Sequence, residues 1–404
     1  MSKKNIGILF PASKKFGGTF QYALSIAGSL LKYSKNYNYT LIYYDKDVPD
    51  LLTYGTNETV NYNSVLLSTE KTPLFKKIAL FTNLITGRKI FNAVKNDEAN
   101  IIKKYKINLL IIPFPSLFGY RNEIPYVVTI PDLMHKYFPK LPEYPFKVRL
   151  RRDIEYTNAA KYSVFTVGDS NQGIEDIHKF LKIPLNRCRV IYYMPPGYIY
   201  ENKDMDIADA SRLLSKYNLP DKYLFYPAQF WSHKNHIRLI RALSLIKERN
   251  GVEIPLILVG SPQESFDKII NLVKELKLLN QVLHLGYVTS KEIVALYKKS
   301  YALIFPDIMG PTNIPPLEAL VLNTPIICSN AFGMPEQITD AGLLFNPYDI
   351  EDIAEKVYKL WNDSGLKEKL INNGKKIAGK LDYKTYAKNW ENIIGEALDI
   401  ISGF

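Results

Sequence analysis

Residues 310–320, GPTNIPPLEAL, place two prolines and a glutamate where an apolar run gives way to a helical pattern. Thr312 or Asn313 is suited to cap a helix that begins near Ile314, because short polar side chains accept hydrogen bonds from the first N–H groups of a helix. A proline is compatible with the first turn of such a helix. The free N–H groups of residues 313–317, with the helix dipole behind them, are therefore expected to bind a phosphate or diphosphate.

Two charged side chains complement an anion site of this kind. Glu318 lies about one turn inside the helical pattern, where its carboxylate can accept hydrogen bonds from a ribose diol beside the phosphate. Lys234, in YPAQFWSHKNH (residues 226–236), also follows an apolar run and can neutralise phosphate charge. Each residue has a simpler interpretation, since a glutamate near a helix start complements the dipole and a lysine there is usually only solvated. Both interpretations stay open for each residue.

A pair of glycines marks a further candidate loop in the N-terminal half. Gly17 and Gly18, followed by Thr19, lie between the first apolar run and the first helical pattern. Glycines at that position let a bound group approach the backbone closely, although an ordinary tight turn uses them too. Neither the G-x-G-x-x-G dinucleotide pattern nor a P-loop is present.

Asp132 and His135 are candidate catalytic residues in VVTIPDLMHKYFP, residues 127–139. Both follow a strand pattern, and either can act on a hydroxyl group. A structural hydrogen bond is an equal alternative for each.

Metal ligands are not grouped in this sequence. Its five histidines and two cysteines show no H-x-x-x-H or C-x-x-C spacing. The D-x-D triplets at 45–47 and 204–206 have no supporting context and are attributed to chance. Cys188 and Cys328 lie in apolar segments and are interpreted as small buried side chains. We therefore expect no metal and no other cofactor.

Short apolar runs separated by helical patterns must position these residues. Continuous apolar strands joined by helices are typical of a parallel sheet covered on both faces. The sequence predicts an α/β fold with two Rossmann-like, doubly wound domains, residues 1–200 and 201–382, whose strand ends can face one central cleft. The polar segment 200–222 is predicted to be a linker. A last helix within 383–404 has no strand after it and can pack back on the N-terminal domain or on the C-terminal one. The predicted strands are 5–10, 39–44, 107–112, 126–130, 162–167 and 189–193 in the first half, and 222–226, 254–259, 281–286, 301–305, 324–328 and 342–345 in the second.

Composition and charge narrow the class of protein. The chain has 404 residues, of which 47% are hydrophobic, and its net charge of +12 is attractive to polyanions. No secretory signal and no apolar run of about 18 residues is recognisable, so a cytoplasmic location is expected.

A basic segment between Glu70 and Asp97 indicates a possible contact with a membrane surface. It contains six basic residues and no acid, and several apolar residues repeat at helical spacing. A basic amphipathic helix can lie on anionic lipid, whereas the alternative is an ordinary packed helix with a solvated basic rim. The residues concerned are Lys71, Phe75, Lys76, Lys77, Ile78, Phe81, Ile85, Arg88, Lys89 and Lys95.

Four of these stretches together resemble the retaining glycosyltransferases of the GT-B fold, in the large family 4 group (glycosyl transferases group 1). GPTNIPPLEAL followed by NTPIICS resembles the donor motif of that family, and YPAQFWSHKNH resembles the segment that supplies a phosphate-binding lysine. HLGYV (284–288) is similar to the turn beside the nucleotide base, and GGTFQYAL to the glycine loop of the acceptor domain. The resemblance covers the second half of the chain and, more loosely, the first.

The resemblance implies a set of site residues and three departures from the family pattern. The first of two glutamates in the donor motif is replaced by Gly310, so that Asn313, Thr312 or Asp307 would have to take over its contact with the sugar. Gln229 replaces a common basic residue, and Pro131 replaces a common histidine before Asp132, for which His135 is a candidate substitute. The implied donor-binding residues are Gln229, Lys234, Tyr287, Val288, Thr312, Asn313, Ile314 and Glu318; the implied catalytic residues are Lys234, Glu318, His135 and Asp132; and the glycine loop is Gly17, Gly18 and Thr19.

The implied function is transfer of a sugar from a nucleoside-diphosphate sugar to a hydroxyl acceptor, with retained anomeric configuration and without a metal. Expected partners are the nucleotide sugar, a glycan or lipid-linked acceptor in surface polysaccharide or lipopolysaccharide assembly, and an anionic membrane surface, but not nucleic acid. Two alternatives stay open: a nucleotide-sugar epimerase or phosphorylase on the same fold, and a catalytically silent protein that binds polyanions. The sequence does not identify the base, the sugar or the acceptor.

Overall fold

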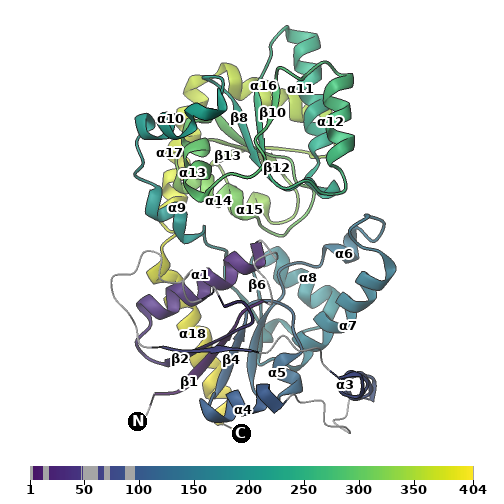
Figure 1. The fold of residues 1–404 in the computed structure, drawn as a ribbon, viewed down its shortest axis with the longest axis vertical. Helices are drawn as coiled ribbons and strands as arrows, with labels where there is room; N and C mark the ends of the chain where they lie inside the picture. Colours follow the sequence, from purple (N-terminus) through teal and green to yellow (C-terminus); the bar gives the residue numbers. More distant parts are fainter. Residues whose placement is uncertain are drawn as a thin grey trace. The chain divides into compact units, whose positions relative to one another are not determined.

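The computed structural model describes residues 3–11, 18–46, 48, 62–67, 73–86 and 96–403. Their contacts divide the chain into two compact units (Figure 1). Unit 1 is formed by residues up to 137, by 146–194 and by the segment from 382 onward, and unit 2 by 138–145 and 195–381. Several residues singled out in the sequence lie outside the described ranges: Gly17, Asp47, Lys71, Arg88, Lys89 and Lys95.

Unit 1 is built on a parallel sheet, which in the described residues has the strand order β3-β2-β1-β4-β5-β6-β7. Every residue of β4, β5 and β6 is buried, as expected for strands covered by helices on both faces. The strands are β1 (Asn5–Leu9), β2 (Asn38–Tyr43), β3 (Tyr62–Leu66), β4 (Leu109–Ile112), β5 (Tyr126–Thr129), β6 (Phe165–Gly168) and β7 (Cys188–Val190). The helices are α1 (Gly18–Tyr33), α3 (Leu74–Thr86), α4 (Asn96–Lys104), α5 (Phe118–Arg121), α6 (Met134–Tyr137), α7 (Phe146–Tyr162), α8 (Asn171–Leu181), the short η2 (Leu185–Arg187) and α18 (Tyr383–Ser402).

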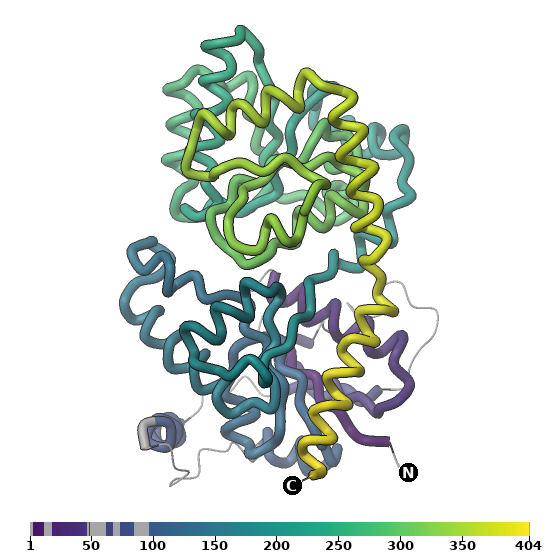
Figure 2. Tube along the Cα trace, turned by 180° about the vertical axis from the view of Figure 1, so that it is seen from behind, coloured from purple at the N-terminus to yellow at the C-terminus, as the bar shows by residue number. Residues whose placement is uncertain are grey.

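The last helix of the chain, α18, belongs to unit 1 and packs against α1 (Figure 2). Its Trp390 is fully buried. Tyr383 and Ser25 share a hydrogen bond of 3.2 Å between their hydroxyl oxygens, and Asn36 donates one of 3.0 Å to Glu391. Of the two positions that the sequence left open for this helix, it takes the one on the N-terminal unit.

Helix α3 has apolar side chains on two faces. Leu80 and Leu84 pack against a buried cluster of unit 1. Leu74, Phe75, Ile78 and Phe81 lie on the other face, with 52% to 73% of each residue exposed. The helix expected from the basic segment is therefore present, but its outer face is an apolar surface and not only a basic rim. None of the helices in the described part of the chain is long and apolar enough to span a membrane.

Unit 2 is built on a second parallel sheet, with the strand order β10-β9-β8-β11-β12-β13 among the described residues. β9, β11 and β12 are buried throughout. The strands are β8 (Leu224–Pro227), β9 (Leu256–Val259), β10 (Val282–His284), β11 (Ala302–Phe305), β12 (Ile326–Ser329) and β13 (Gly342–Phe345). The helices are α9 (Gly197–Asn202), α10 (Ile207–Leu214), η3 (Ser215–Tyr217), η4 (Ser232–Lys234), α11 (His236–Asn250), α12 (Phe266–Glu275), α13 (Ser290–Lys299), α14 (Ile314–Val321), α15 (Met334–Ile338), α16 (Ile350–Asn362) and α17 (Ser364–Ala378). The two parallel sheets confirm the predicted α/β fold class with one Rossmann-like sheet in each half.

The segment predicted to be a linker, 200–222, is folded. It contains α10, which packs on α13, and the end of α9, which contacts both α13 and α14. Asp206 caps α10 by accepting a hydrogen bond of 2.6 Å from the Asp209 amide. The prediction of a linker was wrong because the segment is polar on the face that these helices expose, while Ala210 and Leu214 are buried.

Candidate functional site

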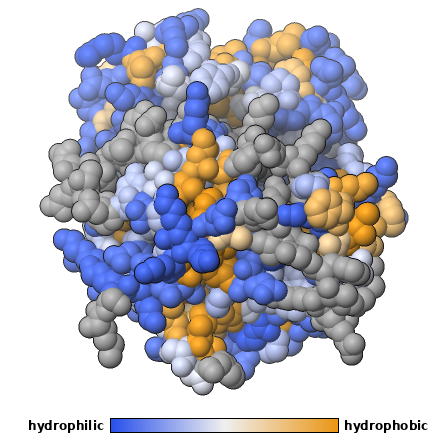
Figure 3. Space-filling model, turned by 60° about the horizontal axis from the view of Figure 1, so that its bottom comes forward, coloured by the Kyte–Doolittle hydropathy of each residue, from blue (hydrophilic) through white to orange (hydrophobic). Residues whose placement is uncertain are grey.

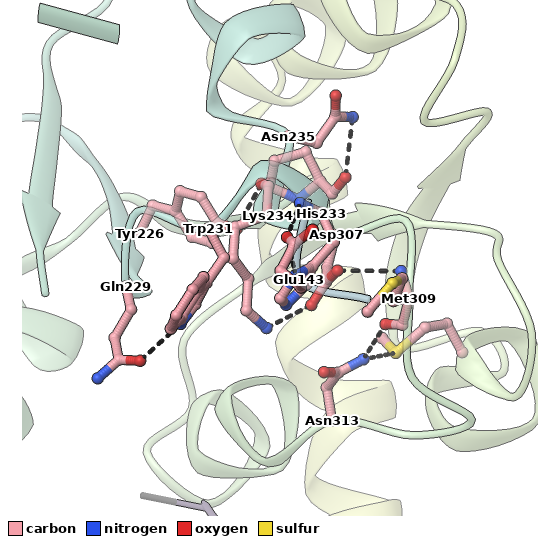
Figure 4. A network of polar contacts seen from close by, with 12 residues as sticks. Glu143, Tyr226, Gln229, Trp231, His233, Lys234, Asn235, Asp307, Met309 and Asn313 are labelled. Carbon is pink, nitrogen blue, oxygen red and sulfur yellow. Dashed lines mark hydrogen bonds and ion pairs between the residues drawn. The ribbon is translucent and has the colours of Figure 1, made fainter. Parts of the chain in front are cut away.

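Neighbouring strands bring the second-half candidates to one edge of the sheet in unit 2. β8 and β11 pair in parallel, so the residues that follow them lie at the same edge. The turn 232–235 follows β8, and Asp307 follows β11. Figure 4 shows these residues in one network of polar contacts.

The turn 232–235 is held by other parts of unit 2 at each of its residues. The amide of Ser232 donates to Glu264, and that of Ile308 donates to the carbonyl oxygen of His233. Asn235 adopts the left-handed conformation, with φ of +60°. Further hydrogen bonds run from the Tyr226 hydroxyl to the carbonyl oxygen of Lys234 at 2.7 Å, and from Asn235 Nδ2 to the carbonyl oxygens of Pro306 and Pro347 at 3.0 and 2.8 Å. A turn bound in this way presents its side chains in a fixed geometry.

Lys234 forms an ion pair with Asp307 (Figure 4). The Asp307 side chain is 1% exposed and that of Lys234 is 20% exposed. Asp307 also accepts a hydrogen bond of 3.0 Å from the amide of Met309. The ammonium group is therefore anchored on its protein side while part of the lysine side chain remains accessible.

The start of α14 has fewer free amides than the sequence analysis assumed. Asn313 occupies the cap position, but its side chain makes no capping hydrogen bond and instead donates to the Met309 carbonyl oxygen at 3.3 Å. Its own amide donates to Gln337 at 2.9 Å. Prolines have no N–H group, so Pro315 and Pro316 contribute none. Of the orphan amides at the start of this helix, that of Ile314 remains as a candidate donor to an anion.

Gly310 has a backbone conformation that explains why no glutamate stands there. Its φ of +97° is rarely adopted by L-residues. A Cβ at this position would also lie 3.1 Å from Asn313 Nδ2 and 3.2 Å from the Thr312 carbonyl oxygen. The departure from the family motif is thus built into the loop, and the Asn313 carboxamide occupies the space next to it.

Glu318 is buried and accepts hydrogen bonds at both of its carboxylate oxygens. Tyr198 donates to Oε1 at 3.0 Å and Tyr297 to Oε2 at 2.8 Å. Burial raises the pKa of Glu318, and the two tyrosines partly oppose that rise. A ribose diol would therefore bind to lone pairs that the tyrosines leave free, or replace one tyrosine.

Three other candidate residues of the second half differ in their solvent exposure. Gln229 is exposed, and its side-chain oxygen accepts a hydrogen bond of 2.8 Å from the Trp231 indole. Tyr287, in the turn after β10, is 91% exposed, and the neighbouring Val288 is buried.

Asp132 forms an ion pair and His135 a hydrogen-bond-distance contact with side chains of α7 within unit 1. Asp132 accepts two hydrogen bonds from the Arg152 guanidinium, at 2.9 and 3.0 Å. His135 is buried, with its Nε2 2.8 Å from an oxygen of Asp153. Burial and the nearby Arg152 lower the pKa of His135, against the opposing effect of Asp153. This arrangement agrees with the structural alternative that the sequence left open for both residues.

The described part of the glycine loop is the start of α1. Gly18 and Thr19 are the first two residues of that helix, and Gly18 is exposed. A Cβ at Gly18 would meet no atom within 4 Å, so the space beside it is open.

Sequence reasoning missed several residues of the unit 2 network, among them Glu143, Tyr198, Tyr297 and Gln337. Glu143 lies 90 positions before its partner His233, and Tyr198 lies 120 positions before Glu318. No spacing rule connects residues so far apart. In the described residues no cluster of three or more His, Cys, Asp or Glu side chains is arranged to hold a metal ion.

A family model matches most of unit 2. Residues 211–377 match the family model described as glycosyl transferases group 1. We call these matched residues the group 1 domain. The turn with Lys234, Asp307, Gly310 and the start of α14 all lie inside this group 1 domain.

Curated relatives match part of the chain. The serotype-specific mannosyltransferase WbdA of Escherichia coli is 30% identical over 160 residues, which are 39% of this chain and 20% of that protein. The O-antigen chain mannosyltransferase RfbU of Salmonella typhimurium is 28% identical over 180 residues, 42% of this chain and 50% of that protein. The chain thus spans between a fifth and a half of the length of these two relatives.

Solved structures match over nearly the whole chain. A glycosyltransferase from Rickettsia africae covers 98% of this chain and 99% of its own, with a TM-score of 0.72 and 18% identity. HepE of Anabaena, in complex with UDP and glucose, covers 97% and 100%, with a TM-score of 0.74 and 15% identity. At these identities the likeness concerns the fold, and it confirms the predicted GT-B class around the group 1 domain.

Proposed function

We propose that this protein is a glycosyltransferase that moves a hexose from a nucleoside-diphosphate sugar to a hydroxyl acceptor, with retention of anomeric configuration. The observation that carries the proposal is the anchored Lys234 ammonium group, which lies in a group 1 domain and in one network with the start of α14. A preorganised cation is the feature that stabilises negative charge on a departing diphosphate.

In the proposed reaction, the bond between the sugar C1 and the diphosphate oxygen breaks and the electron pair leaves with the diphosphate. Lys234 and the amide of Ile314 would stabilise that charge. The acceptor hydroxyl forms the new bond to C1, and its proton goes to the leaving diphosphate. Because the protein itself supplies the positive charge, the proposal includes no metal ion, and turnover should persist in excess EDTA.

The destination of the sugar is proposed from the names of the relatives. WbdA and RfbU are mannosyltransferases, and RfbU acts on the O-antigen chain by its name. We therefore place the reaction in the assembly of a surface polysaccharide or lipopolysaccharide. The base and the sugar are left to experiment, since the solved HepE complex contains UDP and glucose.

A thermal-shift panel followed by a transfer assay tests this proposal. A ligand that binds only the folded protein raises its stability by about 2.7 kcal/mol when present at 100 times its Kd. Among UDP, GDP, ADP and their sugars, the nucleotides with one base should therefore raise the Tm of the protein, and those with the other two bases should leave it unchanged. The stabilising sugar nucleotide is then incubated with and without a glycan acceptor. Release of nucleoside diphosphate only with acceptor supports a transferase, while a new sugar nucleotide formed from donor alone would indicate an epimerase.

We further propose that the protein works as a peripheral protein on the cytoplasmic face of a membrane, through the outer face of α3. Leu74, Phe75, Ile78 and Phe81 form this face, and Lys77 beside it is exposed. In Figure 3 hydrophobic side chains gather at the right of the molecule, on the side where Figure 1 shows α3. The helix contains no acid, so its charge is complementary to an anionic bilayer.

Vesicle co-sedimentation tests the membrane proposal. The protein should sediment with vesicles of phosphatidylglycerol and phosphatidylcholine, and less with phosphatidylcholine alone. Phe75→Ser with Phe81→Ser should abolish the binding, whereas Leu279→Ser, at another exposed apolar residue in unit 2, should not. Absence of binding to either vesicle, or equal binding of both variants, would rule out this role of α3.

A further inference from the structure

Segment 138–145 comes from the N-terminal half of the sequence but belongs to unit 2. It connects α6 to α7, both of which are parts of unit 1. Phe138 packs edge-on against Phe332, with ring centroids 6.0 Å apart. Glu143 contacts the turn 232–235 (Figure 4). The group 1 domain therefore receives side chains from a segment that the matched residues 211–377 do not include.

Glu143 binds His233 at two points. Its Oε1 accepts a hydrogen bond from the His233 amide at 3.3 Å and lies 2.9 Å from His233 Nδ1. Burial alone would raise the pKa of Glu143, but the hydrogen bonds from His233 outweigh it and hold that pKa below its usual value. Because an ionised carboxylate only accepts hydrogen bonds, Nδ1 carries the proton that it donates. The contact thus fixes both the backbone and the ring of His233.

Lys234 is the residue after His233, so the contact between Glu143 and His233 also restrains the backbone that carries Lys234. The other bonds that hold the turn, to Glu264, Tyr226, Ile308, Pro306 and Pro347, all come from residues after 195. Glu143 is the partner from the N-terminal half among the described contacts of the turn. The Glu143 side chain is only 10% exposed, so its contact with His233 is a mostly buried interaction and not a mobile pair on the surface.

We propose that Glu143 is a positioning residue of the donor site, which acts through His233 to fix the turn that presents the Lys234 ammonium group to the diphosphate. This inference rests on the proposed function, since it assumes that the donor is a nucleoside diphosphate. The hydrogen-bond acceptor of Glu143 is essential to this role. Its negative charge is not, because a second carboxylate near an anion site opposes the binding of a diphosphate. That distinction separates a positioning role from an electrostatic one.

Calorimetric titration of the 404-residue protein with UDP and with GDP, together with kcat and KM for the donor, tests the proposal. Glu143→Ala should weaken diphosphate binding and raise the donor KM about tenfold, with a smaller change in kcat. Glu143→Gln keeps an oxygen acceptor for His233 and should restore binding to at least the wild-type value. Glu175→Ala, an exposed glutamate of α8, is the matched control and should change neither quantity.

Two variants distinguish failure of this inference from failure of the proposed function. If Lys234→Ala weakens diphosphate binding and Glu143→Ala does not, Glu143 has no positioning role and the donor site stands. If neither variant weakens binding, the donor site itself is wrong. Equal losses for Glu143→Ala and Glu143→Gln would assign the effect to charge and overturn positioning. A lowered Tm for Glu143→Ala with unchanged binding would make the contact structural only.

Discussion

From the ion pair between Lys234 and Asp307 we predict that substitutions can separate an effect on unfolding free energy from an effect on sugar transfer. Lys234→Met keeps most of the apolar length of the side chain but removes its ammonium group. Asp307, at 1% exposure, is then left as a buried carboxylate without its cation. Removing one partner of a buried pair costs about 3–5 kcal/mol. Because Lys234 itself is 20% exposed, we expect about 2–4 kcal/mol of lost unfolding free energy, discounted for partial solvent screening.

A second substitution removes the stranded charge. Asp307→Asn retains an oxygen that can accept the hydrogen bond from Met309, which spans 3.0 Å in the wild type. The double variant Lys234→Met with Asp307→Asn should therefore recover most of the lost unfolding free energy. It should not recover transfer, because the cation that stabilises the leaving diphosphate is still missing. By analogy with the loss of one preorganised donor, kcat should fall by about 10²–10³ in both variants.

Urea denaturation followed by fluorescence measures the first effect, and release of nucleoside diphosphate in the presence of acceptor measures the second. The denaturant slope should be the same for all three proteins, so that midpoints report unfolding free energy directly. Two outcomes would refute the reasoning. One is a single variant as stable as the wild type, which would mean that Asp307 does not depend on Lys234. The other is a stable double variant with normal turnover, which would remove Lys234 from the reaction.

Three further predictions concern other parts of the same units. Gly310→Ala should lower stability by about 1–2 kcal/mol, the usual cost of a left-handed conformation for an L-residue, and a normal Tm would show that the loop conformation is not required. Tyr198→Phe removes a hydrogen bond that lowers the pKa of Glu318, so the acid limb of the pH profile of kcat/KM should move to higher pH; an unchanged limb would exclude Glu318 from the rate. The Glu292 carboxylate has its pKa lowered to about 2 because hydrogen bonds, first from Lys216, outweigh its burial. A depressed carboxyl pKa stabilises the fold above the unfolded value of about 4.5 and loses that effect as pH falls toward 2. Glu292→Gln should therefore be about 1–2 kcal/mol less stable at pH 7 and equal to the wild type near pH 2, whereas a difference independent of pH would assign the effect to packing.

Much of the sheet architecture follows from the sequence because buried parallel strands are continuous apolar runs. The predicted runs 301–305 and 324–328 correspond to β11 and β12, whose residues are all buried. β3 was not predicted. It pairs on one side with β2, at the end of the strand order, and most of its side chains are exposed. Asn63 and Ser64 interrupt Tyr62–Leu66, so this strand lacks the continuous apolar run of a buried strand.

The candidate site was predictable only where its residues are close in sequence. Lys234 and the start of α14 were found because each follows an apolar run at a strand end. The ion pair of Lys234 with Asp307, 73 positions away, and the bonds of Glu318 to Tyr198 and Tyr297 depend on which strands become neighbours. The amides of α14 were overestimated for a local reason: Pro315 and Pro316 lack N–H groups, and Gln337 takes the amide of Asn313.

The place of α18 has a consequence for how the protein is made. Synthesis proceeds from the N-terminus, and domains usually fold in that order. Here the fully buried Trp390 and the helix that carries it emerge from the ribosome only after the whole of unit 2. Unit 1, although it begins first, keeps the surface of α1 uncovered until translation has passed residue 402. In the nascent chain, unit 2 should therefore complete its folding before unit 1. A ribosome stalled before α18 should carry a unit 1 that is sensitive to protease and a unit 2 that resists it.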